Sequence, residues 1–110
     1  NVSSGLAFAP KKCAPVYCAT KAGLHSFTLS LRNQLEGSPV KVFELIPPLA
    51  ETAMTEGRGG SKISVREVAE ALLKGFAADR FEINVGPVAL LRGMLRIAPR
   101  WAHSLVKNKA

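Results

Sequence analysis

Alternating helix and strand patterns are the feature of this sequence that most constrains its fold. Residues 16–36 carry apolar side chains at steps of three or four, the spacing of one buried helical face. Those apolar positions are Leu24, Phe27, Leu31 and Leu35. Gly37 and Pro39 end this helix. Residues 40–46 then form an apolar, β-branched run that stops at two prolines, which predicts a buried strand.

The pattern continues in the second half of the chain. Ser64 and Glu67 form a capping box that opens another helix. The apolar stripe of that helix consists of Val65, Val68, Leu72 and Phe76, widened by Ala69 and Leu73. Residues 81–85 alternate as a strand does, and 88–110 are helix-prone with a break at Pro99. With a strand end at the start of the chain, the order β-α-β-α-β-α predicts an α/β fold with a parallel sheet covered by helices.

Composition excludes several classes of protein. Hydrophobic residues make up 47% of the chain and charged residues 21%, which fits a globular domain and argues against disorder. No apolar stretch approaches the roughly 20 residues of a membrane-spanning helix. Cys13 and Cys18 are too few for a disulfide framework, so we expect thiols in a reducing, cytoplasmic compartment. His25 and His103 lack acidic or Cys companions at ligand spacing, so we expect no metal site.

Tyr17 and Lys21 form the strongest candidate for chemistry. They lie four residues apart on a predicted helix, so both side chains project from one face, one turn apart. A phenol ordinarily has a pKa of about 10 and transfers protons poorly at neutral pH. A nearby ammonium favours the phenolate, so the pair is a physically sensible acid–base unit. A half-buried Tyr beside a solvated Lys would show the same spacing.

Ser4 strengthens this interpretation. It lies thirteen residues before Tyr17, at the expected end of the first strand. A hydroxyl there could bond a substrate carbonyl and stabilise the developing oxyanion. The alternative is a Ser that caps backbone groups in a turn. Because the carboxyl ends of parallel strands share one edge of a sheet, Ser4, the start of the Tyr17 helix and the loop after Ile46 should lie there together.

Two stretches together resemble the active-site segments of the short-chain dehydrogenases/reductases. The first is Asn1-Val2-Ser3-Ser4-Gly5 followed by Pro15-Val16-Tyr17-Cys18-Ala19-Thr20-Lys21-Ala22-Gly23. It is similar to the family's strand ending in a catalytic Ser, followed by Tyr-x-(Ala/Cys/Ser)-(Ser/Thr)-Lys. The second covers residues 42–52 and is similar to the family's next strand and its Pro-Gly-x-x-x-Thr loop. The resemblance is strong over residues 1–55 and rests on element order beyond them.

This resemblance implies the C-terminal, catalytic half of a Rossmann-like doubly wound parallel sheet, with the N-terminal half absent. It implies that Ser4 holds the substrate oxygen and that Tyr17 is the general acid/base. Lys21 would favour the phenolate and hold the cofactor ribose. The implied cofactor is NAD or NADP. Its implied binding residues are Tyr17, Lys21, Pro47, Pro48, Ala50 and Thr52.

The sequence departs from the family pattern in two respects, which bear on cofactor binding and on the activity of this chain alone. Pro48 stands where the family usually has Gly, and Pro fixes φ and removes a backbone N–H. The family's Gly-rich phosphate loop and the upstream Asn of its catalytic tetrad are also missing. The chain begins without Met, on what reads as a strand end, so we expect a truncated chain that is inactive alone. The full-length protein should be the enzyme, and the family implies a homodimer through the Tyr17 helix.

We expect residues 1–110 to form a single partial domain, with 49–62 as a mobile substrate loop and 87–110 as a C-terminal helical extension. That extension carries three arginines at four-residue steps, opposite apolar positions. They are Arg92, Arg96 and Arg100. This amphipathic arrangement predicts contact with an anionic membrane surface, a cap over the substrate, or simply a solvated basic face. The net charge of +7 is open to the same range of explanations, including a charge imbalance left by truncation.

Together these patterns predict an NAD(P)-dependent oxidoreductase that interconverts a small-molecule carbonyl and its alcohol, with Tyr17 transferring the proton. The substrate, the choice of NAD or NADP and the physiological direction stay open. Two other classes remain as alternatives: a catalytically inactive truncated fragment, and a basic module that binds membrane or nucleic acid. The nucleic-acid alternative is disfavoured because the positive charge is dispersed and no recognition motif is present. Related epimerases also use Tyr-x-x-x-Lys, but the Ser4 segment fits the reductases better.

Overall fold

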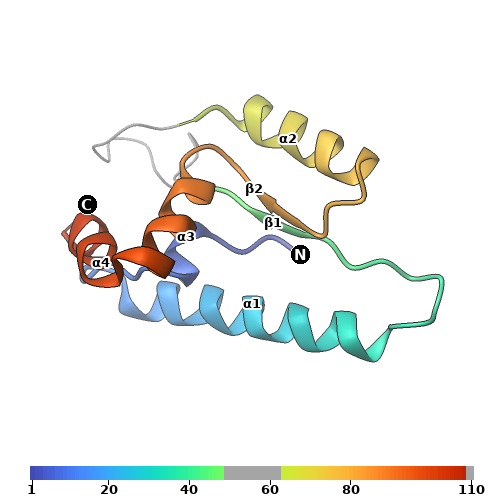
Figure 1. The fold of residues 1–110 in the computed structure, drawn as a ribbon, viewed down its shortest axis with the longest axis horizontal. Helices are drawn as coiled ribbons and strands as arrows, with labels where there is room; N and C mark the ends of the chain where they lie inside the picture. The colour runs from blue at the N-terminus through green and yellow to red at the C-terminus, as the bar shows by residue number, and fades with distance from the viewer. Residues whose placement is uncertain (49–62, 109–110) are drawn as a thin grey trace.

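The computed structural model describes residues 1–48 and 63–108. In chain order these residues form η1, a 3₁₀ helix (Gly5–Ala7), α1 (Pro15–Gln34), β1 (Glu44–Ile46), α2 (Val65–Ala77), β2 (Glu82–Asn84), α3 (Val88–Ile97) and α4 (Pro99–Lys107). The expected loop at 49–62 lies outside the described residues. Figure 1 shows the strands between α1 on one side and α2 on the other, with α3 and α4 gathered at one end of the strands.

β1 is the middle of three parallel segments. It pairs with β2 in parallel, with Leu45 opposite Ile83. On its other side, Val2 forms a parallel bridge with Leu45. Backbone bonds continue this pairing: Ser3 N donates to Leu45 O at 2.9 Å, and Gly5 N donates to Pro47 O at 3.0 Å. The predicted α/β fold with parallel strands is therefore confirmed, although both strands are shorter than the sequence pattern indicated.

α2 packs on the sheet through small side chains. The buried cluster of Leu45, Ile83 and Val85 is covered by Val68 and Ala71 of this helix. Gly75 comes so close to β2 that a Cβ there would lie 2.5 Å from Ile83 Cδ1. The predicted stripe is confirmed for Val68, which packs on this cluster, and was wrong for its other members, which are exposed. The exposed members are Val65, Ala69, Leu72, Leu73 and Phe76.

α1 packs on the strands largely through polar groups. Thr28 is fully buried, whereas Phe27 is 58% exposed, so the predicted buried face was wrong for Phe27. His25 bonds the carboxylate of Glu44 in β1, and Arg32 Nε donates to Val42 O at 3.2 Å. These side chains face the sheet because buried carboxylate and carbonyl oxygens need donors.

The helix boundaries follow the expected signals. Ser64 Oγ accepts from Glu67 N at 3.1 Å and donates to Glu67 Oε1 at 3.3 Å, which confirms the capping box. Pro15 occupies the first turn of α1, and Pro99 opens α4, so the break at Pro99 is also confirmed. Among the described residues no helix is both long enough and apolar enough to cross a membrane.

Arg92 departs from the predicted basic stripe. Its Nη1 donates to the carboxylate of Glu82 and, at 3.2 Å, to Asn84 Oδ1. Its guanidinium also stacks over the ring of Phe8, 4.4 Å from the centroid. Arg92 thus joins α3 to β2 and to the loop after η1. The predicted stripe was wrong for Arg92, because Glu82 and Asn84, the first and last residues of β2, bind its guanidinium.

Candidate active site

Ser4 lies at the point where the N-terminal extended segment turns into η1. Its backbone is extended, its side chain is buried, and its Oγ accepts a hydrogen bond from Leu6 N at 3.1 Å. Ser4 therefore caps η1, as the alternative interpretation of this residue expected. A hydroxyl accepts through a lone pair and keeps its proton for another bond. The cap is thus compatible with donation to a substrate oxygen.

Tyr17 and Lys21 lie on one face of α1, within its first two turns. Pro15 sets the start of this helix, and Figure 1 shows that start at the end of the strands where α3 and α4 lie. Tyr17 is 37% exposed, and Lys21 Nζ lies 5.7 Å from the centroid of its ring. Lys21 Nζ also donates to Val2 O at 3.0 Å. One ammonium therefore contacts both the phenol and the segment that leads to Ser4.

The prolines after β1 border the same edge. Pro47 O accepts from Gly5 N, so the end of β1 is bonded to the residue after Ser4. Pro48 lies beside Gly86 at the end of β2, where a Cβ on Gly86 would be 3.6 Å from Pro48 Cγ. The other two residues predicted to bind the cofactor, Ala50 and Thr52, lie outside the described part of the chain. The structure thus assembles Ser4, the Tyr17–Lys21 pair and both prolines around one edge.

A buried polar cluster beneath this edge was missed by the sequence reasoning. Glu44 is fully buried, and its two carboxylate oxygens lie 2.8 and 2.9 Å from His25 Nδ1. Ser3 Oγ donates to Glu44 Oε2 at 2.6 Å. The signal was a Glu within an apolar strand, because a charged residue there needs partners. Its partners are distant in sequence, so local spacing does not reveal them.

Glu82 extends this cluster toward β2. His25, Glu44 and Glu82 each place one potential metal-ligand atom within 4.8 Å of those of the other two, a separation at which three side chains could hold a metal ion. Each carboxylate already has a protein donor, however: Ser3 and His25 on Glu44, and Arg92 on Glu82. A cation here would compete with the guanidinium of Arg92. Ion pairing and hydrogen bonding account for the cluster, and the absence of a metal site stays a prediction.

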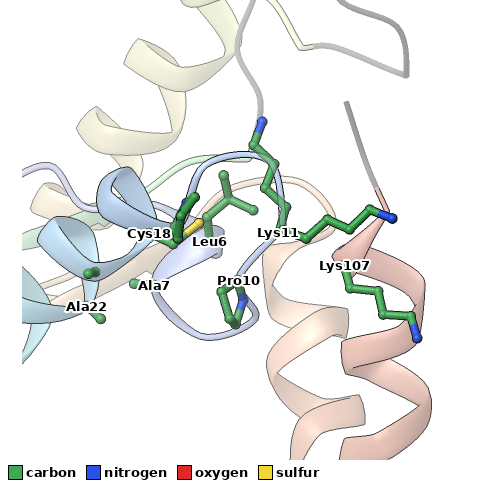
Figure 2. Close-up of a pocket in the computed structure, with 10 residues that line it drawn as sticks. Leu6, Ala7, Pro10, Lys11, Cys18, Ala22 and Lys107 are labelled. Atoms are coloured by element: carbon green, nitrogen blue, oxygen red, sulfur yellow. The ribbon is translucent and has the colours of Figure 1, made fainter.

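A hollow of about 530 Å³ lies on the flank of α1. Figure 2 shows Cys18 and Ala22 of α1 on one side of it and Lys11 and Lys107 on the other. Lys12 N donates to Lys107 O at 2.9 Å, which joins α4 to the loop before α1. The described residues that line the hollow do not include Ser4, Tyr17 or Lys21. The hollow therefore lies beside the candidate active site rather than at it.

Comparison with known proteins agrees with this geometry. The sequence model of the short chain dehydrogenase family matches residues 1–62. The chain belongs to the short-chain dehydrogenase/reductase family. The matched residues include Ser4, Tyr17, Lys21 and the loop after β1, so the segment that carries the candidate site is the segment that carries the family signal.

Individual relatives give the same picture. The chain is 42% identical over 102 residues to the uncharacterized oxidoreductase DltE of Bacillus subtilis (strain 168), covering 87% of this chain and 40% of that protein. It is 33% identical over 95 residues to an uncharacterized oxidoreductase of Staphylococcus aureus (strain N315), covering 80% and 41%. The chain thus spans about two fifths of the length of these relatives.

A solved short-chain dehydrogenase from Burkholderia cenocepacia J2315, in complex with NADP, has a similar fold. The TM-score is 0.88 at 25% identity, and the match covers 96% of this chain and 45% of that one. The predicted Rossmann-like, doubly wound α/β fold is therefore confirmed for the part of the domain that this chain represents.

Proposed function

We propose that the full-length protein containing this chain is an NAD(P)-dependent oxidoreductase that interconverts a carbonyl and an alcohol. The observation that carries the proposal is the position of Lys21, whose ammonium contacts the ring of Tyr17 and the backbone of the Ser4 segment. An acid–base residue and a hydroxyl donor are thereby held at one edge of a parallel sheet, where open α/β folds bind their ligands.

Each of the three residues has a distinct task in the reductive direction. Tyr17 donates its phenolic proton to the substrate oxygen, and its partial exposure leaves room for a substrate. Ser4 donates a hydrogen bond to the same oxygen, since its own lone pair serves the backbone of η1. Lys21 places its ammonium over the Tyr17 ring, 5.7 Å from the centroid, and offers its N–H donors to the cofactor. The nicotinamide supplies or accepts the hydride.

The residues present fit a nicotinamide cofactor. An ammonium has three N–H donors, and Lys21 uses one of them on Val2 O. Two donors are therefore left for the hydroxyls of a ribose. Pro47 and Pro48 have no N–H groups, so they would shape the nicotinamide pocket by contact rather than by backbone donation. Ala50 and Thr52 complete the proposed set. We propose NAD or NADP, as the Burkholderia relative was solved with NADP.

The proposal includes a homodimer formed through α1. Val16 and Phe27 on this helix are 75% and 58% exposed, a high exposure for large apolar side chains. We also propose a cytoplasmic protein, since Cys13 and Cys18 are thiols rather than halves of a disulfide. A function in binding membranes or nucleic acid has less support, because the inward turn of Arg92 interrupts the basic stripe.

The test is nicotinamide oxidation by the full-length protein with a panel of aldehydes and ketones, measured beside Tyr17→Phe. This substitution removes only the phenolic hydroxyl of the one tyrosine in the chain. Turnover should fall by at least about 100-fold, the usual loss when a general acid is removed. Cofactor affinity, measured by nicotinamide fluorescence, should fall far less than turnover, because Lys21 and the prolines are unchanged.

Ser26→Ala, an exposed position on the same helix, is the matched control and should turn over like the wild type. If Tyr17→Phe keeps wild-type turnover, Tyr17 is not the proton donor. If the wild-type protein binds the cofactor yet reduces none of the carbonyls, the inactive alternative is favoured.

A further inference from the structure

Glu44 joins three elements of the structure through one buried carboxylate. It belongs to β1 and has no exposed surface. His25 of α1 bonds it through Nδ1, and Ser3 of the N-terminal segment bonds its Oε2. The imidazole donates through Nδ1–H in the tautomer or protonation state that suits a carboxylate. A strand, a helix and a loop segment are thus tied together at one point.

Because the Glu44 carboxylate is buried, the positions of its hydrogen-bond donors are tightly constrained. A carboxylate removed from water must be satisfied by donors, and each donor must hold its position to satisfy it. In the described structure no buried side-chain polar atom lacks a hydrogen-bond partner. The positions of Ser3 and His25 are therefore coupled to Glu44 and, through it, to each other.

The two partners of Glu44 are next to the proposed reaction site. Ser3 is the residue immediately before Ser4. His25 follows Lys21 by four residues, so it lies one turn further along the same face of α1. Two further bonds join α1 to the two residues before Ser3: Lys21 Nζ donates to Val2 O, and Asn1 Nδ2 donates to Thr28 Oγ1 at 2.9 Å.

We propose that Glu44 is a positioning residue for the Ser4–Tyr17–Lys21 site. It fixes the Ser4 hydroxyl relative to the helix that carries Tyr17 and Lys21, by holding Ser3 on one side and His25 on the other. This inference rests on the proposed function. A displacement of reacting groups by about 1 Å costs on the order of 100-fold in rate, so a residue that sets this spacing acts on turnover without touching the substrate.

Glu82 provides a matched control within the same cluster. It lies opposite Glu44 in the register of the sheet, and its carboxylate bonds Arg92 rather than the Ser4 segment. Glu44→Gln and Glu82→Gln each remove one carboxylate charge by the same isosteric change, at two positions that face each other across the sheet. Only the first substitution disturbs the link between Ser3 and His25.

The experiment compares Glu44→Gln, Glu82→Gln and Ser3→Ala in the full-length protein. We expect Glu44→Gln to lower kcat by at least about 10-fold, through misplacement of the Ser4 hydroxyl. The Kd for NAD(P)H should change far less, because Lys21 and the prolines are untouched. Ser3→Ala keeps the His25 bond and should lose part of kcat while remaining folded. Adding it to Glu44→Gln should cost little more, since both act through one contact.

Hydrogen exchange of the peptide 1–8 gives a second readout that needs no turnover. Glu44→Gln should exchange faster there than Glu82→Gln, because the Ser3 link is lost. Equal exchange in the two variants, or unchanged kcat in Glu44→Gln and Ser3→Ala, would overturn the positioning role. A loss of thermal stability with kcat preserved would show a purely structural role and would also overturn it. Retention of turnover by Tyr17→Phe would contradict the proposed function alone. The exchange comparison would still test the contact of Glu44 with Ser3, because it needs no turnover.

Discussion

In the proposed reaction the hydroxyl of Ser4 serves two partners at once. Its lone pair accepts from Leu6 N, which fixes the side chain as the cap of η1. Its proton stays available for the substrate oxygen. The bond to the backbone restricts the rotation of the hydroxyl, so the donor is oriented before a substrate arrives. Preorganised donors of this kind stabilise developing negative charge more effectively than mobile ones.

Ser4→Ala should therefore affect both activity and stability. We expect kcat to fall by about 100-fold or more, as when an oxyanion donor is removed. The free energy of unfolding should fall by about 1 kcal/mol, because the Leu6 N–H loses its acceptor. Ser38→Ala is the control: Ser38 Oγ likewise accepts from a backbone N–H two residues on, that of Val40, at 3.2 Å. Steady-state kinetics and urea unfolding should show a similar stability loss in both variants and a rate loss in Ser4→Ala alone.

The sequence predicts some residues of this site better than others. Tyr17 and Lys21 are recognisable because their relation is local, four residues on one helix. Ser4 is recognisable because it ends a strand at a fixed distance before them. Glu44 and His25 are separated by nineteen residues and meet only when α1 packs on β1. Their contact depends on the packing of two elements, which no local spacing encodes.

At the scale of the elements, α2 reaches the sheet through a glycine. Gly75 is buried against Ile83, which belongs to the core of the sheet. Any side chain at this position would push the helix away from β2 or displace Ile83. Two larger apolar residues of α2, Leu73 and Phe76, are 68% and 61% exposed. Phe76 still contacts the ring of Phe43 at a centroid distance of 5.2 Å.

Gly75→Ala should destabilise the protein although Ala is the better helix former. The added Cβ meets two Ile83 atoms at 2.5 Å, and overpacking of a core of this kind costs about 1–3 kcal/mol. Gly93→Ala on α3 is the matched control, because a Cβ there meets nothing within 4 Å. It should raise the free energy of unfolding by about 0.5–1 kcal/mol. Urea unfolding of the full-length protein measures both changes. Equal effects of the two substitutions would contradict the close approach of α2 to β2.

Periodicity in the sequence located the helices but only part of their packed faces, such as Val68 of α2. The spans 16–36 and 64 onward match α1 and α2 closely, since a repeat of three to four residues identifies a helix whatever it contacts. Which face of each helix packs depends instead on the part of the sheet that the helix contacts. α1 meets buried carboxylate and carbonyl oxygens, so Thr28 is buried and Phe27 is not. α2 meets β2 at close range, so Gly75 is buried and Phe76 is not.

At the scale of the whole molecule, the described residues bury few large apolar side chains and expose many. Several of the exposed ones lie on α1, α2 and α3. They include Val16, Phe27, Leu73, Phe76, Leu90 and Ile97. The chain also spans only about two fifths of the length of its matched relatives. We expect exposed apolar side chains in this number to pack against other protein, either elsewhere in a longer chain or in a second copy.

The 110-residue chain produced alone should therefore self-associate, whereas the full-length protein should form a defined oligomer. The exposed apolar residues, together with strands that offer unpaired edges, favour non-specific association of the short form. Sedimentation velocity at two concentrations should show a broad, concentration-dependent distribution for the short chain and a single species for the long one. Dye binding to apolar surface should be several-fold stronger for the short chain, on the order seen for partly packed states. A monomeric short chain with one cooperative urea transition would contradict this expectation, because it would show that these 110 residues bury enough surface to fold by themselves.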